Sequence, residues 1–306
     1  MTSAPTPALA WLQAGDAFPP VASAWGHASP APGLLAAGGA LDVATLQAAY
    51  AQGIFPWYSA GQPTLWWNPD PRMVLRLEEF KLHRSLRKTL QKFKDNPDCE
   101  IRINHDFAAV VRACAQSPRK PQAAGEDSSG DGGNSESNGA STDGSAATDR
   151  AQTAKPAKTH SQTASAESTQ ATSTPHTWIQ PEMVSAYTQL HQAGMAHSVE
   201  TWAHGQLMGG LYCTALGAAV FGESMFANAT DASKIALCAL VALCKAQGVA
   251  RIDCQQNTAH LASLGAREMP RAQFCHHVDT DAQKPALRWQ FEPIYWSTLL
   301  PTKTDY

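Results

Sequence analysis

The segment that most restricts the fold is residues 231–248, an apolar run that predicts a helix with very little polar surface. Asp231 is a residue type whose side chain can accept hydrogen bonds from the free amides of a first helical turn. Gly248 is a good left-handed C-terminal cap. The apolar positions between them are Ile235, Leu237, Leu240, Val241, Leu243 and Cys244. We therefore expect this helix to be buried on most sides against a sheet.

A short strand ending at Gln255 is expected directly after this helix. Side chains alternate between the two faces of a strand, so Asp253 and Gln255 point the same way. Glu223 lies in the strand expected before the helix, on a face shared with Phe221 and Met225. If the two strands are neighbours, two carboxylates and an amide converge beside an apolar wall. The alternative is that Asp253 and Gln255 form the solvent-facing side of an edge strand.

Composition excludes several classes of protein. The chain has 306 residues and a formal net charge of −3. It can therefore bury a sizeable core in one or two domains, and it is not a globally basic nucleic-acid binder. Its seven cysteines include no Cys-x-x-Cys pair, which argues against a disulfide framework and a structural zinc site. A reducing compartment is expected.

Neither a secretory signal nor a membrane span is expected. The N-terminal Met-Thr-Ser-Ala-Pro-Thr-Pro run has no basic residue and no continuous apolar core. The longest apolar run, residues 235–244, is well short of the roughly 20 residues that span a bilayer. These observations predict a soluble cytoplasmic protein without a membrane partner.

The N-terminal half predicts a flexible lead-in over residues 1–32 and a small α/β domain over residues 33–116. The lead-in is rich in Ala, Pro and Gly. Within the domain, Asp42 is expected to cap a short helix that Gly53 ends. Two prolines in the Trp-Trp-Asn-Pro-Asp-Pro-Arg run at residues 66–72 forbid helix and hold the backbone extended.

An amphipathic helix is expected over residues 82–94. Its buried stripe consists of Leu82, Leu86, Leu90 and Phe93, which recur at helical spacing. The other side carries four cations, namely Arg84, Arg87, Lys88 and Lys92. Such a face is usually only solvated charge. In a chain with a negative net charge, however, a cluster of one sign is also a reasonable landing site for an RNA backbone.

Residues 117–176 differ in character from the rest of the chain. They contain no Leu, Ile, Val, Met or aromatic residue. Such a segment buries too little apolar surface to offset the entropy of ordering, so a disordered insertion is expected. The fold should tolerate it, because the cost of closing a loop grows slowly with loop length.

Residues 177–306 predict a second domain. Pro181 suits the first turn of a helix and Gly194 its end. Three strand-like runs follow at residues 197–202, 206–214 and 218–226. The turns between these runs are short, which predicts an antiparallel meander. With the buried helix and the strand after it, the pattern predicts an α+β fold.

Several longer motifs resemble one family of enzymes. They are Gly-Ile-Phe-Pro-Trp at 53–57, the run at 66–72, Trp-Ile at 178–179, Ala-His-Ser-Val-Glu at 196–200, Gly-Glu-Ser-Met-Phe at 222–226, Ala-Ser-Lys at 232–234, Ile-Asp-Cys-Gln at 252–255 and Ser-Leu-Gly-Ala-Arg-Glu at 263–268. In this order they resemble the bacterial leucyl/phenylalanyl-tRNA-protein transferases, apart from the long insertion. The resemblance implies that the C-terminal domain is acetyltransferase-like (GNAT).

The resemblance also implies an activity. Members of this family move Leu, Phe or, less well, Met from aminoacyl-tRNA to the α-amine of proteins whose N-terminal residue is Arg or Lys. The product enters the bacterial N-degron (N-end rule) degradation pathway. Because the aminoacyl ester is already activated, the reaction needs no covalent enzyme intermediate, no cofactor and no metal. The family analogy implies a monomer.

Three polar residues are candidates for the chemistry. The acceptor α-amine has a pKa of roughly 7.7 to 8.0 and must lose a proton before it attacks. A carboxylate beside it can help to move that proton, and our hypothesis gives this role to Asp253, acting through Gln255, whose amide would donate to it. Alanine at either position is expected to remove most turnover while RNA binding survives. Glu223 can pair with the cationic side chain of the acceptor or with an amino group of the donor.

Selection among Leu, Phe and Met needs a deep apolar pocket. The candidates for its wall are Trp57, Leu211, Val220 and Phe221. The resemblance implies that Trp57 helps to wall this pocket and that Trp178 and Tyr187 border the active cleft, although Trp57 and Tyr187 are otherwise expected in ordinary core packing. It also implies that basic residues of the 82–94 helix bind tRNA, and Arg84 matches one of them.

Two other functions are alternatives. The first is an acyl-CoA-dependent N-acetyltransferase on the same fold. Such enzymes usually hold pyrophosphate in a glycine-rich turn before their main helix, whereas residues 226–231 contain no glycine. The second is a non-catalytic RNA-binding adaptor, which would use the basic helix and leave Glu223, Asp253 and Gln255 without a role.

Overall fold

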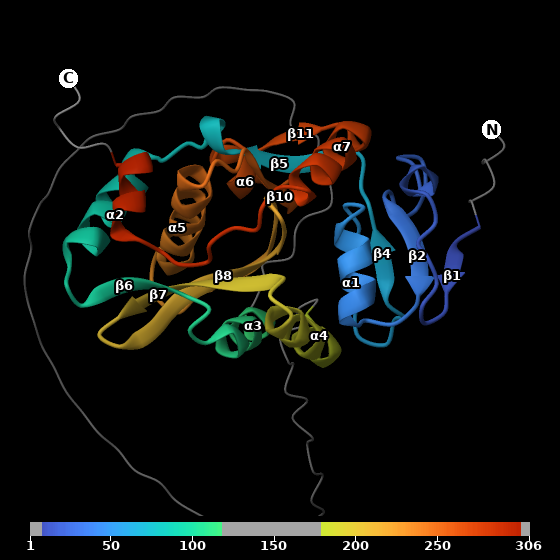
Figure 1. The fold of residues 1–306 in the computed structure, drawn as a ribbon, viewed down its shortest axis with the longest axis horizontal. Coiled ribbons are helices and arrows are strands. Elements are labelled where there is room, and N and C mark those ends of the chain that lie inside the picture. The colour runs from blue at the N-terminus through green and yellow to red at the C-terminus, as the bar shows by residue number, and fades with distance from the viewer. Residues whose placement is uncertain (1–7, 118–178, 301–306) are drawn as a thin grey trace, which may run out of the picture. The chain divides into compact units, whose positions relative to one another are not determined.

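The computed structural model describes residues 8–117 and 179–300. The predicted insertion at 117–176, apart from Ser117, lies outside the described residues, and so does Trp178. The described residues form two β-sheets with helices packed against them, as Figure 1 shows. The prediction of a mixed fold of helices and sheets is thus confirmed.

The apolar run at 231–248 is a helix, as its sequence predicts. It forms α5 (Ala232–Ala246), in which every residue from Ile235 to Cys244 is buried. Gly248 follows it at φ 74°, in the left-handed region that favours glycine. The predicted cap is wrong, because Asp231 itself adopts φ 63° and makes no capping bond. Its carboxylate binds Lys234 Nζ at 2.7 Å instead.

The larger sheet has seven strands in the order β11-β5-β10-β9-β8-β7-β6. Their bounds are β5 Arg72–Arg76, β6 Cys99–Ile103, β7 Ala196–Ala203, β8 Gln206–Leu216, β9 Ala219–Ala227, β10 Arg251–Gln255 and β11 Arg267–Met269. The predicted antiparallel meander of β7, β8 and β9 is confirmed. After α5, β10 returns parallel to β9, and β5 pairs antiparallel with its other edge.

The smaller sheet has four strands in the order β1-β2-β4-β3. Their bounds are β1 Ala10–Leu12, β2 Leu34–Gly38, β3 Phe55–Pro56 and β4 Leu65–Trp67. Helix α1 (Val43–Tyr50) begins at the predicted cap, where Asp42 accepts from the amide of Thr45 at 2.8 Å. Part of the expected flexible lead-in is ordered, because β1 pairs in parallel with β2.

The two sheets do not follow the division that we predicted at residue 116. β5 and β6 precede that residue, but both belong to the larger sheet. Helices α2 (Arg84–Asp95) and α3 (Phe107–Gln116) also pack against it. The N-terminal half therefore contributes to both sheets, because β5 finds its hydrogen-bonding partner in β10 rather than in its sequence neighbours.

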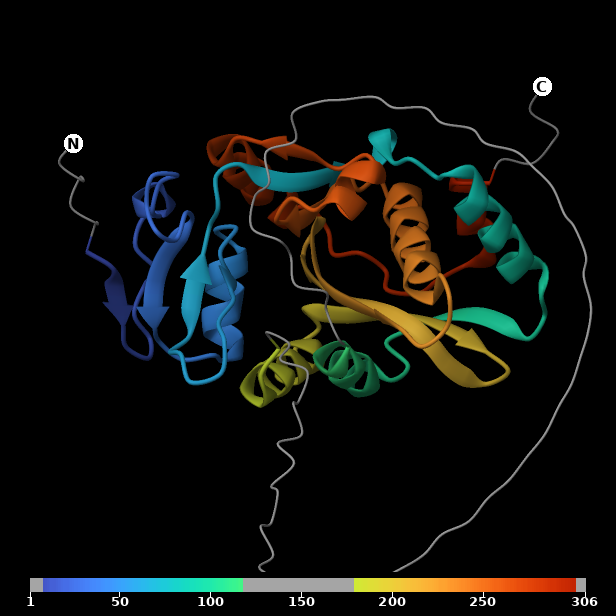
Figure 2. The ribbon, with the colours of Figure 1, turned by 180° about the vertical axis from the view of Figure 1, so that it is seen from behind.

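Helices cover both faces of the larger sheet, as Figures 1 and 2 show. One face packs against α5, α2 and the 3-10 segment η3 (Pro293–Thr298). The other packs against α3, α4 (Pro181–Gln192) and α7 (Arg271–Ala282). Three of the four residues of the predicted α2 stripe are buried, namely Leu86, Leu90 and Phe93, whereas Leu82 precedes the helix and is half-buried. The remaining short elements are η1 (Val21–Ser23), η2 (Leu77–Glu79) and α6 (Ala259–Ser263).

Within residues 8–117 and 179–300, no helix is both long and apolar enough to cross a membrane.

Candidate active site

The strands that carry the candidate polar residues are neighbours. β9 and β10 run parallel, with Ile252 opposite Val220 and Asp253 opposite Phe221. β10 lies between β5 and β9, so it is not an edge strand. Asp253 is only 3% exposed, which excludes the alternative that it faces solvent.

A β-bulge sets the direction of Glu223. The register between β8 and β9 shifts at this point, where Tyr212 pairs with Ser224 and Cys213 pairs with Gly222. Glu223 is therefore the extra residue of the bulge, and the alternation of side chains changes there. Phe221 packs in the cluster under α3 and α4, whereas Met225 packs in the cluster under α5. The prediction that both share one face with Glu223 is wrong for Met225.

Glu223 accepts hydrogen bonds from four neutral donors. Its Oε1 accepts from Tyr50 Oη at 2.6 Å and from Thr214 Oγ1 at 2.7 Å. Its Oε2 accepts from Tyr187 Oη at 3.2 Å and from Gln255 Nε2 at 3.3 Å. Burial raises the pKa of the Glu223 carboxyl above its ordinary value, although the hydrogen bonds oppose this increase.

Glu223 has no ion-pair partner among the described residues. In the part of the chain that the structure describes, none of the salt bridges formed by Lys, Arg or His involves this carboxylate. The negative charge of an ionised Glu223 is thus solvated by hydroxyl and amide dipoles alone. Such a carboxylate is suited to bind a cationic group of a ligand, because the ligand would supply the missing charge.

Two tyrosines are held as donors to Glu223. Tyr50 and Tyr187 are buried, and their hydroxyl oxygens lie 2.6 Å apart. Burial, followed by the charge of Glu223, raises the pKa of each well above the ordinary value. Both hydroxyls therefore keep their protons at neutral pH. Each has a single proton, so while Tyr50 donates to Glu223, Tyr187 donates either to Tyr50 or to Glu223. Tyr187 was predicted to border the cleft, whereas Tyr50 was predicted only as part of a short helix.

Asp253 forms a buried ion pair with Arg72. Arg72 Nε lies 2.8 Å from Oδ1 and Nη2 lies 2.6 Å from Oδ2, and the two side chains are 0% and 2% exposed. The guanidinium also lies over the rings of Phe55 and Phe274, at 4.7 and 4.5 Å from their centroids. Because both carboxylate oxygens are engaged, the geometry does not fit the predicted role of Asp253 in proton transfer.

Gln255 links Asp253 to Glu223, but not in the predicted way. Its backbone amide donates to Asp253 Oδ1 at 2.9 Å, whereas its side-chain amide donates to Glu223. The expectation that the side-chain amide donates to Asp253 is therefore wrong. The physical reason is local: β10 loses register with β5 after Asp253, and Gln255 takes φ 62°, which turns its side chain toward β9.

A cavity of about 110 Å³ opens beside Glu223 and Gln255. Its wall is mostly apolar and includes Leu211, Met225, Leu237, Leu240, Ile252 and Leu261. Of the predicted pocket residues, Leu211 lines this cavity. The cavity residues from α5 and β10 were not predicted to line a pocket, because their apolar pattern indicates core packing alone.

The structure does not bring the other predicted pocket residues together here. Val220 packs under α5, while Phe221 lies on the opposite face with its ring centroid 5.1 Å from that of Tyr50. The two are consecutive residues of one strand, so they cannot share a face. Trp57 is 37% exposed and its ring lies 5.6 Å from that of Trp67.

The basic residues predicted on α2 are exposed together. Arg84, Arg87, Lys88 and Lys92 are all exposed, and Arg87 Nη1 donates to the carbonyl of Leu299 at 3.4 Å. In both views of the ribbon, α5 lies between α2 and β10. The basic face is thus separate from the cluster around Glu223.

Three polar residues of the cluster, Arg72, Tyr50 and Thr214, were not predicted as site residues from the sequence. Arg72 had a usable signal, since an arginine at the start of the apolar Arg-Met-Val-Leu strand requires a buried anion. Tyr50 and Thr214 had none, because a tyrosine on a helix and a threonine in a strand are ordinary. Over residues 8–117 and 179–300, no group of three or more His, Cys, Asp and Glu side chains could hold a metal ion.

Comparisons with known proteins agree with one another. The model of the leucyl/phenylalanyl-tRNA protein transferase family matches residues 74–125 and 152–279, and the model of its N-terminal domain matches residues 39–70. The leucyl/phenylalanyl-tRNA–protein transferase of a Polaromonas species is 52% identical over 290 residues, which cover 95% of this chain and 93% of the relative. The enzyme of Albidiferax ferrireducens is 46% identical over 300 residues, covering 98% and 97%. The chain therefore belongs to the leucyl/phenylalanyl-tRNA protein transferase family of aminoacyltransferases.

Proposed function

We propose that this chain transfers Leu, Phe and, less well, Met from aminoacyl-tRNA to the α-amine of proteins whose N-terminal residue is Arg or Lys. The product would carry a destabilising N-terminus and enter the N-degron pathway of a bacterial cytoplasm. The observation that carries the proposal is an uncompensated carboxylate, Glu223, at the side of an apolar cavity. An aminoacyl ester offers the matching pair of groups, an ammonium and an apolar side chain on the same carbon.

The cavity favours the donor residues that the family name implies. Its wall is formed mainly by aliphatic side chains from β8, β9, β10 and α5. Leu, Phe and Met bring no polar group into such a wall, whereas a polar donor side chain would lose its hydrogen bonds there. Selection among donors therefore rests on this cavity.

The position of Glu223 decides which amine it binds in this proposal. With the donor side chain in the cavity, the donor α-ammonium lies one bond from the carbon that carries the side chain. Glu223 lines the same cavity, so it pairs with the donor α-ammonium rather than with the Arg or Lys side chain of the acceptor. Tyr50, Thr214 and Tyr187 hold the carboxylate in place for this contact.

The chemical step needs little from the protein besides orientation. The acceptor nitrogen attacks the ester carbonyl, the carbon–oxygen bond to the ribose breaks, and the proton lost by the amine ends on the ribose oxygen. With a pKa of roughly 7.7 to 8.0, on the order of 10–20% of α-amines are already neutral at pH 7. A neutral acceptor can therefore bind directly, and the carbonyl oxygen of the Gln255 side chain orients it.

Asp253 acts as a positioning residue in this scheme. It accepts the backbone amide of Gln255 and is itself held by Arg72. Removing it would release the left-handed conformation of Gln255 and with it the contact to Glu223. The loss of turnover expected for Asp253→Ala thus has a structural origin, not the loss of a base.

The rest of the proposal concerns fold and RNA. The meander, α5 and the parallel return of β10 support an acetyltransferase-like (GNAT) arrangement around the site. Arg84, Arg87, Lys88 and Lys92 form an exposed surface suited to an RNA backbone. The protein would act as a monomer, without a cofactor.

The two alternative functions have less support. An acyl-CoA enzyme would need a glycine-rich turn before α5 to hold pyrophosphate, whereas residues 226–231 contain no glycine and end in the acidic Asp231. An adaptor would have no use for a carboxylate that four donors hold beside an apolar cavity.

Mass spectrometry of a peptide that begins with Arg tests the proposal. After incubation with this protein and Phe-tRNA, a phenylalanyl mass increment is expected, and treatment with RNase should abolish it. An acetyl increment in a parallel reaction with acetyl-CoA would move the chain to the acyl-CoA class. Binding of tRNA without any product would support the adaptor.

A second experiment tests which amine Glu223 binds. Phe-tRNA and N-acetyl-Phe-tRNA, which lacks the donor ammonium, are compared as donors for the wild type and for Glu223→Gln. If Glu223 pairs with the donor ammonium, the Glu223→Gln substitution alone or the N-acetyl group alone should lower kcat/KM by about 100-fold. The variant acting on the acetylated donor should lose little more than that. Additive losses, or a loss limited to acceptors with N-terminal Arg or Lys, would assign Glu223 to the acceptor.

A further inference from the structure

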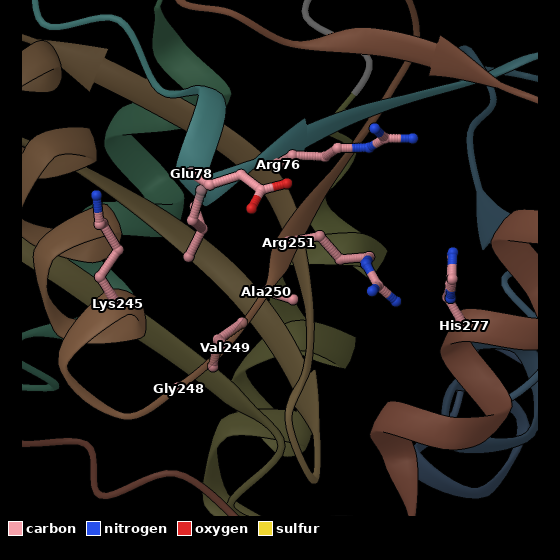
Figure 3. Close-up of a pocket in the computed structure, with 9 residues that line it drawn as sticks. Arg76, Glu78, Lys245, Gly248, Val249, Ala250, Arg251 and His277 are labelled. Atoms are coloured by element: carbon pink, nitrogen blue, oxygen red, sulfur yellow. The ribbon is translucent and has the colours of Figure 1, made fainter.

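A second, larger cavity of about 480 Å³ is lined by residues that the proposed reaction does not use. Figure 3 shows its charged and titratable residues, which are Arg76, Glu78, Lys245, Arg251 and His277. They come from β5, η2, the last turn of α5, β10 and α7. The volume lies within the range of roughly 300–1,000 Å³ that is usual for ligand sites.

Two of its arginines oppose each other across neighbouring strands. Arg76 is the register partner of Arg251 in the antiparallel pair of β5 and β10. Like charges that face each other directly across strands are destabilising. In Figure 3 the two guanidinium groups extend to the same side as His277. An anion bound between them would relieve this repulsion.

The charges of the cavity are only partly neutralised. Arg251 pairs at 2.9 Å with Asp281, which Lys284 also contacts at 2.6 Å. Arg76 pairs at 3.3 Å with Glu79, and the Arg76 side chain remains 43% exposed. Glu79 is shared in turn, because Arg267 lies 2.9 Å from its other oxygen.

Lys245 and Glu78 form no salt bridge within the part of the chain that the structure describes. Burial lowers the pKa of His277, and the charge of Arg251 adds to this effect although Asp281 opposes it. His277 is therefore neutral at pH 7 and can donate one ring N–H to an anion.

We propose that this cavity binds a phosphate group of the aminoacyl-tRNA substrate, through Arg76, Arg251 and Lys245. The inference rests on the proposed function, which supplies the RNA. β5 and β10 each reach from this cavity to the candidate active site. Arg76 and Arg251 lie at the cavity ends of these strands, and Arg72 and Gln255 lie at the other ends. Four residues of strand span roughly 13 Å. A phosphate bound here therefore belongs to the nucleotides near the aminoacylated 3′ end.

Binding of uncharged tRNA to the full chain at several salt concentrations tests the inference. Lys245→Gln and Arg76→Gln should each weaken binding on the order of 3- to 10-fold and reduce the salt slope by about 0.7–0.9. Glu78→Gln removes a carboxylate from the cavity wall, so this variant should bind tRNA more tightly than the wild type. Arg112→Gln is the matched control, because Arg112 is an exposed arginine of α3 outside the cavity. It should bind as the wild type does.

Two further measurements separate the possible failures. If the wild type binds tRNA and transfers Phe, but the Lys245 and Arg76 variants bind tRNA unchanged, the cavity does not hold the RNA and the inference is wrong while the function stands. If pyrophosphate binds the wild type and not these variants, with tRNA binding unaffected, the occupant is a small phosphate compound and the RNA assignment is overturned. A wild type that neither binds tRNA nor transfers Phe would refute the proposed function, and the RNA assignment with it.

Discussion

Breaking the ion pair between Arg72 and Asp253 is expected to destabilise the protein by about 3–5 kcal/mol. The two side chains are 0% and 2% exposed and share two short contacts of 2.8 and 2.6 Å. If Asp253 is neutralised, the buried guanidinium loses its counter-ion and keeps the carbonyl of Gly53 at 3.0 Å and two aromatic rings as neighbours. This cost is a large share of the roughly 5–15 kcal/mol that holds a typical domain folded.

A double-mutant cycle with Arg72→Met and Asp253→Asn measures the pair itself. Urea denaturation of the two single variants and of the double variant gives three changes in the free energy of unfolding. The double variant should cost less than the sum of the single ones, with a coupling energy of about 2 kcal/mol or more. Additive costs would refute the reasoning, because they would mean that neither group depends on the other.

The same variants separate positioning from proton transfer. In Asp253→Asn the amide oxygen can still accept the backbone amide of Gln255, but the side chain can no longer act as a base. If Asp253 only positions Gln255, the kcat of the folded fraction should stay within about 10-fold of the wild type. A loss of about 10²–10⁴-fold, typical of a missing general base, would restore the proton-transfer role predicted from the sequence.

Three further predictions concern Glu223, the cavity and a turn. Because burial raises the pKa of Glu223 above 4.5, the folded state binds more protons than the unfolded state just above that value, so the free energy of unfolding should fall as pH rises through this window. Denaturation between pH 4 and pH 8 should show that Glu223→Gln lacks this fall. Leu237→Phe should narrow the cavity and lower kcat/KM for Phe-tRNA about 10-fold more than for Leu-tRNA in a competition assay; an equal loss would place the donor side chain elsewhere. Gly53→Ala should cost about 1–3 kcal/mol in thermal unfolding, since Gly53 has φ 71° and a Cβ would lie 2.7 Å from the ring of Phe274; an unchanged Tm would contradict this.

Local sequence patterns predicted the individual elements well. The apolar run gave α5 its buried surface, the spacing of leucines placed the buried stripe of α2, and Asp42 caps α1 as expected. These features depend on residues within one or two turns of each other, so the pattern alone contains the information. The wrong prediction of an Asp231 cap is also a local effect. A residue in the left-handed conformation cannot place its side chain as a usual N-cap residue does.

The candidate site was predictable only in part. The sequence identified Glu223, Asp253 and Gln255 as polar residues on two strands near the same helix. Their partners depend on contacts between distant parts of the chain: Arg72 and Asp253 are 181 positions apart, and Tyr50 and Glu223 are 173 apart. No local pattern contains such pairings.

By itself, the sequence predicted α1, α2, α4 and α5, the meander and which polar residues stand on β9 and β10, but not α3, α6 or α7. The tertiary structure decided what those residues do, because a bulge at Glu223 and a positive φ at Gln255 rotate side chains away from the regular alternation. Alternation is a property of an ideal strand, whereas bulges and strand partners arise when the sheet packs against its neighbours. The ion pair of Asp253, the donors of Glu223 and the cavity under α5 follow from that packing.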